Sequence, residues 1–129
     1  MKKENDLSTN SGMEKEETPW GKWENLVEYK PGMGYKVKRI TVKPKECLSL
    51  QTHQHRDELW VVVSGTGRIT LDKDVFFLQK GKSVFIPKTV MHRVENSGEI
   101  PLIIIEVQMG EVLIEEEDIV RVEDKYGRA

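Results

Sequence analysis

Three histidines and one glutamate are the residues of this chain best suited to bind a metal ion. Residues 49–60, SLQTHQHRDELW, hold His53, His55 and Glu58, and the third histidine, His92, follows in IPKTVMHRVEN. Three imidazoles and a carboxylate suit Zn, Fe(II), Mn, Ni or Co, and ligand type alone favours none of these metals. The alternative interpretation is that the histidines are exposed strand residues that bind nothing. Because all three fall in two strand-like segments and none in the polar N-terminal stretch, this alternative loses ground, but the spacing alone leaves it open.

The spacing within residues 49–60 conflicts with a regular strand. Alternate side chains of a strand share a face, so Gln51, His53 and His55 point one way and Glu58 the other. A bulge or kink at residues 56–57 would bring Glu58 to the side of the histidines, and bulges often re-aim side chains next to active sites. If Glu58 points away instead, Gln51 is the alternative ligand.

The elements that must position these residues are short strands. From residue 35 onward, alternating and β-branched segments recur at intervals of roughly ten residues, with Gly and Pro in the turns. This pattern predicts an all-β fold, either an antiparallel sandwich or a barrel. The segment EEEDI, residues 115–119, has room for one helical turn. We expect residues 1–18 to be a disordered tail, since they carry almost no large apolar side chains, and residues 19–129 to form one domain.

The amino-acid composition excludes some classes of binding partner and indicates the cellular compartment. The formal net charge is -2 and the sequence pI is near 6.0, which argues against nucleic acid or an anionic membrane surface as the main partner. A small anionic substrate needs only two or three cations and stays open. The single cysteine, Cys47, permits no intrachain disulfide, the apolar runs are too short to span a membrane, and no secretion signal is present. We therefore expect a cytoplasmic domain.

Two sequence motifs connect these residues. The pattern G-x5-P-x-G-x2-H-x3-N fits Gly81, Pro87, His92 and Asn96, with Thr89 at the position of its second glycine. The sequence thereby resembles a cupin, which implies a double-stranded β-helix, a jelly-roll barrel. Threonine in place of glycine predicts that this turn does not need a positive φ angle.

The other cupin motif is G-x5-H-x-H-x(3,4)-E-x6-G. It fits His53, His55, Glu58 and Gly65, but only two residues separate His55 from Glu58. The glutamate is therefore assigned less firmly than the histidines. We lean to Glu58 rather than Gln51 as the fourth ligand beside the three histidines.

A closer resemblance covers roughly residues 19–128. The segments QTHQHRDELW and EDKYGR are similar to the C-terminal domain of type II mannose-6-phosphate isomerases, which is fused in most of that family to a mannose-1-phosphate guanylyltransferase. The resemblance implies a stand-alone domain that interconverts mannose 6-phosphate and fructose 6-phosphate through an enediolate, for GDP-mannose and polysaccharide synthesis. It also implies a divalent metal, with Zn our first choice over Co, Mn, Ni or Fe, and a homodimer.

An isomerase of this kind needs a general base and cations for the phosphate. Glu106 interrupts the apolar run LIIIEV and is our candidate base, although an outward-facing strand residue is an equally good interpretation; Glu58 is a second candidate if it is not a ligand. Basic clusters lie at Lys36, Lys38 and Arg39 and at Arg121, Lys125 and Arg128. From them we choose Lys38, as a catalytic and phosphate-binding cation, and Arg128, as a second phosphate ligand.

Two other functions compete with the isomerase. One is a non-catalytic cupin that binds a sugar or sugar phosphate, as a sensor or a regulatory subunit. The other is an iron-dependent cupin dioxygenase, which uses the same ligands but leaves the C-terminal similarity unexplained. Turnover of mannose 6-phosphate, with and without a chelator, separates them.

Overall fold

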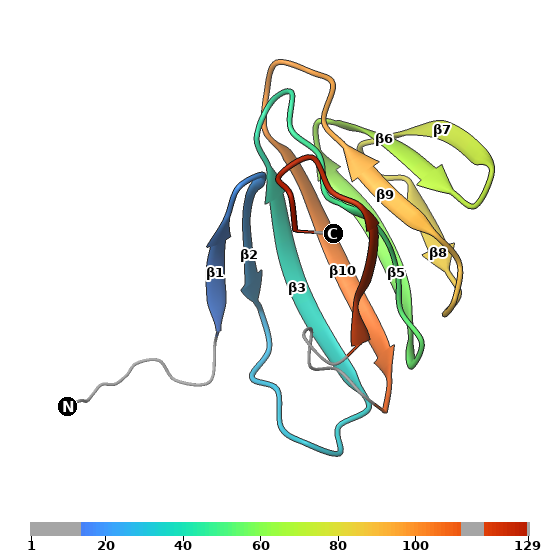
Figure 1. Ribbon diagram of the computed structural model, residues 1–129. Coiled ribbons are helices and arrows are strands. Elements are labelled where there is room, and N and C mark those ends of the chain that lie inside the picture. The colour runs from blue at the N-terminus through green and yellow to red at the C-terminus, as the bar shows by residue number, and fades with distance from the viewer. Residues whose placement is uncertain (1–13, 112–117, 129) are drawn as a thin grey trace.

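The computed structural model describes residues 14–111 and 118–128, which fold into two antiparallel β-sheets (Figure 1). In chain order the strands are β1 (Lys15–Thr18), β2 (Gly21–Asn25), β3 (Tyr35–Val42), β4 (Leu50–Thr52), β5 (Arg56–Ser64), β6 (Thr66–Leu71), β7 (Asp74–Gln79), β8 (Ser83–Ile86), β9 (His92–Glu95), β10 (Leu102–Gly110) and β11 (Val120–Glu123). The first sheet has the order β1-β2-β3-β10-β5-β8, and the second has the order β11-β4-β9-β6-β7. The predicted all-β jelly-roll fold is confirmed. No helix in the described part of the chain is long and apolar enough to cross a membrane.

Three long strands of the first sheet, β3, β10 and β5, lie side by side and carry most of the interior (Figure 1). Alternate residues of each strand are buried, as a half-buried antiparallel strand requires. The strand register aligns these inward residues in rows that cross the sheet. One row joins Ile40, Ile104 and Val62, and the next joins Lys38, Glu106 and Trp60.

The interior is therefore divided along the strands. We call one part the apolar end; its inward residues on these three strands are Ile40, Val42, Val62, Leu102 and Ile104, and they pack against Trp20, Ile69 and Val94. We call the other part the polar end; its inward residues on the same strands are Lys36, Lys38, Arg56, Glu58, Glu106 and Gln108. Trp60 lies at the boundary. All of the polar residues named here are buried, which is costly unless each finds partners.

The ordered part of the chain begins earlier than the sequence predicted. Residues 1–13 lie outside the described residues, but residues 15–18 of the expected disordered tail form β1, which pairs with β2 through Lys15–Glu24 to Thr18–Gly21. The side chains of β1 are largely exposed, so backbone pairing at a sheet edge rather than apolar burial orders this segment. Composition alone cannot reveal such a strand. The predicted helical turn in EEEDI falls mostly on residues 112–117, outside the described part of the chain.

Candidate metal centre

The predicted kink exists, but it lies at residues 54–55 rather than at residues 56–57. Strand β4 ends at Thr52, the chain bends, and β5 starts at Arg56. The carboxylate of Asp118 holds the bend, because it accepts hydrogen bonds from the backbone N–H groups of Gln54 (2.8 Å) and His55 (3.0 Å). The earlier bend changes which side chains enter the barrel. His55 is exposed, and Arg56 is buried beside Glu58 in its place.

A second contact explains why the bend fits at this point. Gly110 of β10 pairs with Arg56, and a Cβ atom at Gly110 would overlap the carbonyl oxygen of His55. Only glycine allows β10 to approach the bent chain this closely.

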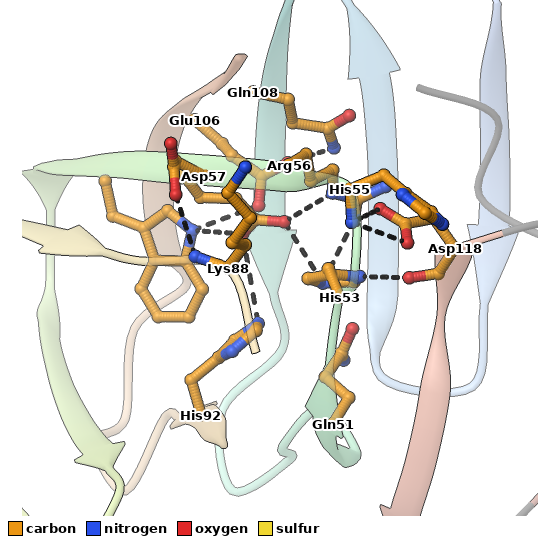
Figure 2. A network of polar contacts seen from close by, with 12 residues as sticks. Gln51, His53, His55, Arg56, Asp57, Lys88, His92, Glu106, Gln108 and Asp118 are labelled. Carbon is orange, nitrogen blue, oxygen red and sulfur yellow. Dashed lines mark hydrogen bonds and ion pairs between the residues drawn. The ribbon is translucent and has the colours of Figure 1, made fainter. Parts of the chain in front are cut away.

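Three of the predicted ligands meet inside the barrel, and Figure 2 labels two of them, His53 and His92. The donor atoms of His53, Glu58 and His92 all lie within 4.8 Å of one another, and each residue is buried. His53 Nε2 is 3.1 Å from Glu58 Oε2, and His92 Nε2 is 3.9 Å from Glu58 Oε1. His55 does not join this cluster.

The second nitrogen of each imidazole fixes the orientation of the ring. His53 Nδ1 donates to the backbone carbonyl of Asp118 at 2.8 Å, and His92 Nδ1 donates to the carbonyl of Val90 at 2.9 Å. The lone pairs at Nε2 then face Glu58, which is the arrangement of metal-ligating histidines. Burial lowers the pKa of His92, which favours its neutral form. Burial would raise the pKa of Glu58, but its close contact with His53 and the charge of Arg56 hold it well below its ordinary value.

Gln51 completes the donor set better than His55 does. It is buried, pairs with His92 across β4 and β9, and donates its amide nitrogen to Ser49 Oγ at 3.0 Å. That bond leaves the amide oxygen as the donor atom that can serve a metal. The cupin motif also fits better in this register, because four residues separate His53 from Glu58 when Gln51 and His53 occupy its two histidine positions.

The same register explains an unusual backbone angle. The glycine that begins the motif then falls at Lys45, which has a φ of 67°. Lysine adopts this left-handed conformation only at some cost, whereas glycine adopts it freely. The positive φ therefore supports Gln51 and His53 as the motif's histidine positions.

The prediction that the turn at Thr89 needs no positive φ is wrong. Thr89 has a φ of 71°, in the region that β-branched residues avoid. Its backbone N–H donates to the carbonyl oxygen of His53 at 2.7 Å, and this contact between two turns holds the strained conformation. The presence of threonine where the motif has glycine therefore does not show that the backbone φ angle at this position is negative.

Arg56 is the site residue that the sequence analysis missed. Its side chain is buried, with Nε 2.8 Å from Glu58 Oε2 and Nη2 3.1 Å from His53 Nε2. A parity count from Glu58 would have placed it inward. An imidazole nitrogen has one lone pair, so His53 can ligate a metal only when Arg56 releases it.

Glu106, the candidate base, faces inward and is 5% exposed, so the outward-facing interpretation is wrong. Trp60 Nε1 lies between the two carboxylates, 2.9 Å from Glu58 Oε1 and 3.0 Å from Glu106 Oε2, and Gln108 donates to Glu106 Oε1 at 2.7 Å. Burial and the neighbouring charge of Glu58 raise the pKa of Glu106 to about 8. Two adjacent carboxyl groups thus differ in protonation at neutral pH.

The cluster opens into a cavity of about 290 Å³. Both predicted phosphate ligands line it: Lys38, whose Nζ lies 3.9 Å from the ring centroid of Trp23, and Arg128, which forms two hydrogen bonds to Asp124. The complete lining is Glu16, Thr18, Trp20, Trp23, Lys38, Ile40, Leu48, Gln51, His53, Arg56, Glu58, Glu106, Ile119, Arg121 and Arg128. The cavity therefore joins the candidate ligands to several cations.

The described donors fit a divalent cation. They comprise two imidazole nitrogens, an ionised carboxylate and an amide oxygen, which together suit Zn and its neighbours in the first transition series. The fit is of ligand type and proximity and does not select one metal.

Comparison with protein families gives the assignment. The family model described as Mannose-6-phosphate isomerase C-terminal matches residues 5–124. This chain belongs to that family. The resemblance found in the sequence is confirmed.

Curated relatives match most of the chain. The chain is 52% identical over 110 residues to a mannose-1-phosphate guanylyltransferase, ManC, of Salmonella typhimurium, covering 85% of this chain and 22% of the relative. It is 51% identical over 111 residues to the alginate biosynthesis protein AlgA of Pseudomonas syringae pv. tomato, and this match covers 86% of this chain and 22% of AlgA. The chain thus spans about a fifth of the length of these relatives.

Solved structures confirm the fold alone. The capsular polysaccharide assembling protein CapF of Staphylococcus aureus aligns with a TM-score of 0.73 at 20% identity, covering 88% of this chain and 33% of CapF. A Schizosaccharomyces pombe Cnp3 cupin domain aligns with a TM-score of 0.62 at 10% identity, and the alignment covers 68% of this chain and 64% of that domain.

Proposed function

We propose that this chain is a metal-dependent isomerase that interconverts mannose 6-phosphate and fructose 6-phosphate. The observation that carries the proposal is one cavity holding two carboxyl groups in different states, an ionised Glu58 among imidazoles and a Glu106 with a pKa of about 8. Such a division separates a ligand from a group that exchanges protons. Membership of the mannose-6-phosphate isomerase C-terminal family supports this substrate.

His53, Glu58 and His92, with Gln51 as the fourth donor, would hold the metal, and zinc is our first choice. When bound, a divalent cation supplies Lewis-acid polarisation of a sugar carbonyl oxygen. His55, which is exposed, has no part in this assignment.

Glu106 would move the proton between the two carbons. The opened aldose has its aldehyde at C1, and isomerisation requires the C2 proton to leave and a proton to arrive at C1, while the O2 hydroxyl proton moves to O1. The ionised form of Glu106 would take the C2 proton and return it at C1. The positive charge of Lys38 favours the ionised form of Glu106 and the negative charge that develops on the sugar oxygens.

A coupled assay of fructose 6-phosphate formation tests the proposal. The protein is stripped with a chelator and reloaded separately with Zn, Co, Mn and Ni. We expect turnover that disappears on stripping and returns with at least one metal. Binding of mannose 6-phosphate without turnover under every condition would reject the isomerase and favour the non-catalytic sugar-phosphate-binding cupin.

Cellular context and assembly are part of the proposal. Relatives are named as a mannose-1-phosphate guanylyltransferase and as alginate and xanthan biosynthesis proteins, so we propose a role in GDP-mannose and polysaccharide synthesis, in the cytoplasm. The homodimer stays a prediction, which sedimentation analysis would test.

A further inference from the structure

The cavity has a second cationic position, on its C-terminal wall. Its wall there is formed by the C-terminal segment, which contributes Ile119, Arg121 and Arg128. Figure 1 shows this segment in dark red, in front of β10 in that view, and its strand β11 pairs with β4 of the second sheet. One side of the cavity is therefore built by residues about 60 or more positions beyond His53.

The strand register places Arg121 in line with the candidate ligands. Arg121 of β11 pairs with Gln51 of β4, and Gln51 pairs with His92 of β9. Residues paired across adjacent strands project to the same face, so the three side chains form one row inside the second sheet. At roughly 4.8 Å per strand, the backbones of Arg121 and His92 are about 10 Å apart.

Among the cations of the described residues 118–128, Arg121 is the one with a buried side-chain donor that has no partner. Asp124 accepts from Arg128 through both carboxylate oxygens, at 2.9 and 3.0 Å, and Lys125 is held by Glu46 at 2.8 Å. The Nε atom of Arg121, in contrast, is buried and has no hydrogen-bond partner among the described residues. A buried donor of this kind gains most from an anion that supplies its missing bond.

We propose that Arg121 binds the phosphate group of the sugar phosphate, while the aldehyde end of the sugar lies at the His53–Glu58–His92 cluster. The inference rests on the proposed function for the position of the reactive end. C1 and C6 of an open hexose are separated by five bonds of about 1.5 Å, or about 6 Å when extended, which suits side chains projecting from positions about 10 Å apart. The guanidinium group can meet two phosphate oxygens at once. Arg121 therefore replaces Arg128 as the principal phosphate ligand, and Arg128 holds the segment in place through Asp124.

Calorimetric titration of the whole metal-loaded chain with mannose 6-phosphate and with mannose tests this assignment. We expect Arg121→Gln to raise the Kd for mannose 6-phosphate by about 10- to 100-fold, as the loss of a charge-assisted contact predicts, and to leave the Kd for mannose within twofold. The matched control is Arg68→Gln, which removes the same charge from a residue paired with Glu95 outside the cavity. It should change neither Kd by more than twofold.

Three results would overturn the inference: a loss below threefold for mannose 6-phosphate, an equal loss for mannose, or a phosphate-specific loss in Arg128→Gln with none in Arg121→Gln. Should Arg121→Gln not fold, as judged by circular dichroism, Arg121→Lys decides instead, with an expected three- to tenfold increase in the Kd for mannose 6-phosphate only. The binding measurement separates this inference from the proposed function. If mannose 6-phosphate binds through Arg121 but is never converted, the phosphate assignment stands and the isomerase proposal fails. If the protein is an isomerase and Arg121→Gln leaves its KM unchanged, the isomerase proposal stands and the phosphate assignment fails.

Discussion

The apolar end and the polar end of β3, β5 and β10 share the same strand backbone but bury side chains of opposite character. At the apolar end Ile40, Ile104 and Val62 pack in a row, while one row further Lys38 and Glu106 occupy equivalent inward positions. Burying the first kind of row stabilises the fold, at about 2 kcal/mol for each large side chain. Burying the second kind costs free energy, which the contacts among its members only partly offset. The polar end is therefore held in place by the apolar end.

The largest expected effect is on activity at the polar end. His92→Ala and His53→Ala should each reduce isomerase turnover by at least about 100-fold and abolish stoichiometric metal binding, because each removes a nitrogen of the donor set. His55→Ala is the matched control, since its side chain is exposed; it should keep both properties. Elemental analysis beside the coupled assay gives the readout. Full activity in the His92 variant, or loss of bound metal in the His55 variant, would contradict the assignment of these residues as metal ligands.

The next effect is on stability at the apolar end. Ile104→Ala should lower the free energy of unfolding by about 2–5 kcal/mol, because Ile104 is fully buried and its loss leaves a cavity. Ile105→Ala, on the opposite face of β10 and only partly buried, should cost less than half as much. Urea denaturation measures both. Similar values for the two variants would contradict the division of the strand into an inner and an outer face.

Glu106→Gln should separate stability from activity. In the metal-free protein, burial raises the pKa of Glu106 from an ordinary 4.5 to about 8. The folded state thus keeps a proton that the unfolded state releases, so wild-type stability falls as pH rises from about 4.5 to 8. The neutral glutamine removes this loss, and we expect a gain on the order of 4 kcal/mol at pH 8, none at pH 4, and turnover reduced by at least about 100-fold.

The measurement is thermal or urea unfolding at several pH values, with Glu99→Gln as the control because Glu99 is strongly exposed. If the Glu106 variant gains equally at pH 4 and pH 8, its carboxyl group does not titrate as described.

The smallest expected effect concerns strain in the turn beside the site. Thr89→Gly should stabilise the fold by roughly 0.5–1 kcal/mol, because relief of a positive φ in a β-branched residue exceeds the added entropy of glycine in the unfolded chain. Thr41→Gly, in the regular part of β3, should destabilise instead. Urea midpoints compare the two. A loss of stability in Thr89→Gly would mean that the threonine side chain makes a contribution larger than the strain.

The sequence was sufficient for the fold and for three of the four predicted metal ligands as a cluster, because strand periodicity and motif spacing are local signals. It was insufficient where residues distant in the chain decide the geometry. The position of the kink, and with it the exchange of His55 for Arg56, depends on Asp118, more than 60 residues away. Strand pairing likewise decides that the Glu106 side chain points inward. It also decides that residues 15–18 form a strand. The alternation of side chains along the sequence shows neither.

Asp118 also links the site to the order in which the chain is made. It supplies the carbonyl that orients His53 and the carboxylate that fixes the bend, and it lies 65 residues after His53. A chain leaving the ribosome exposes His53 and Glu58 well before Asp118, and domains are synthesised from the N-terminus. His53 thus lacks its orienting partner until Asp118 has been synthesised, so metal captured earlier would be held by a looser set of donors.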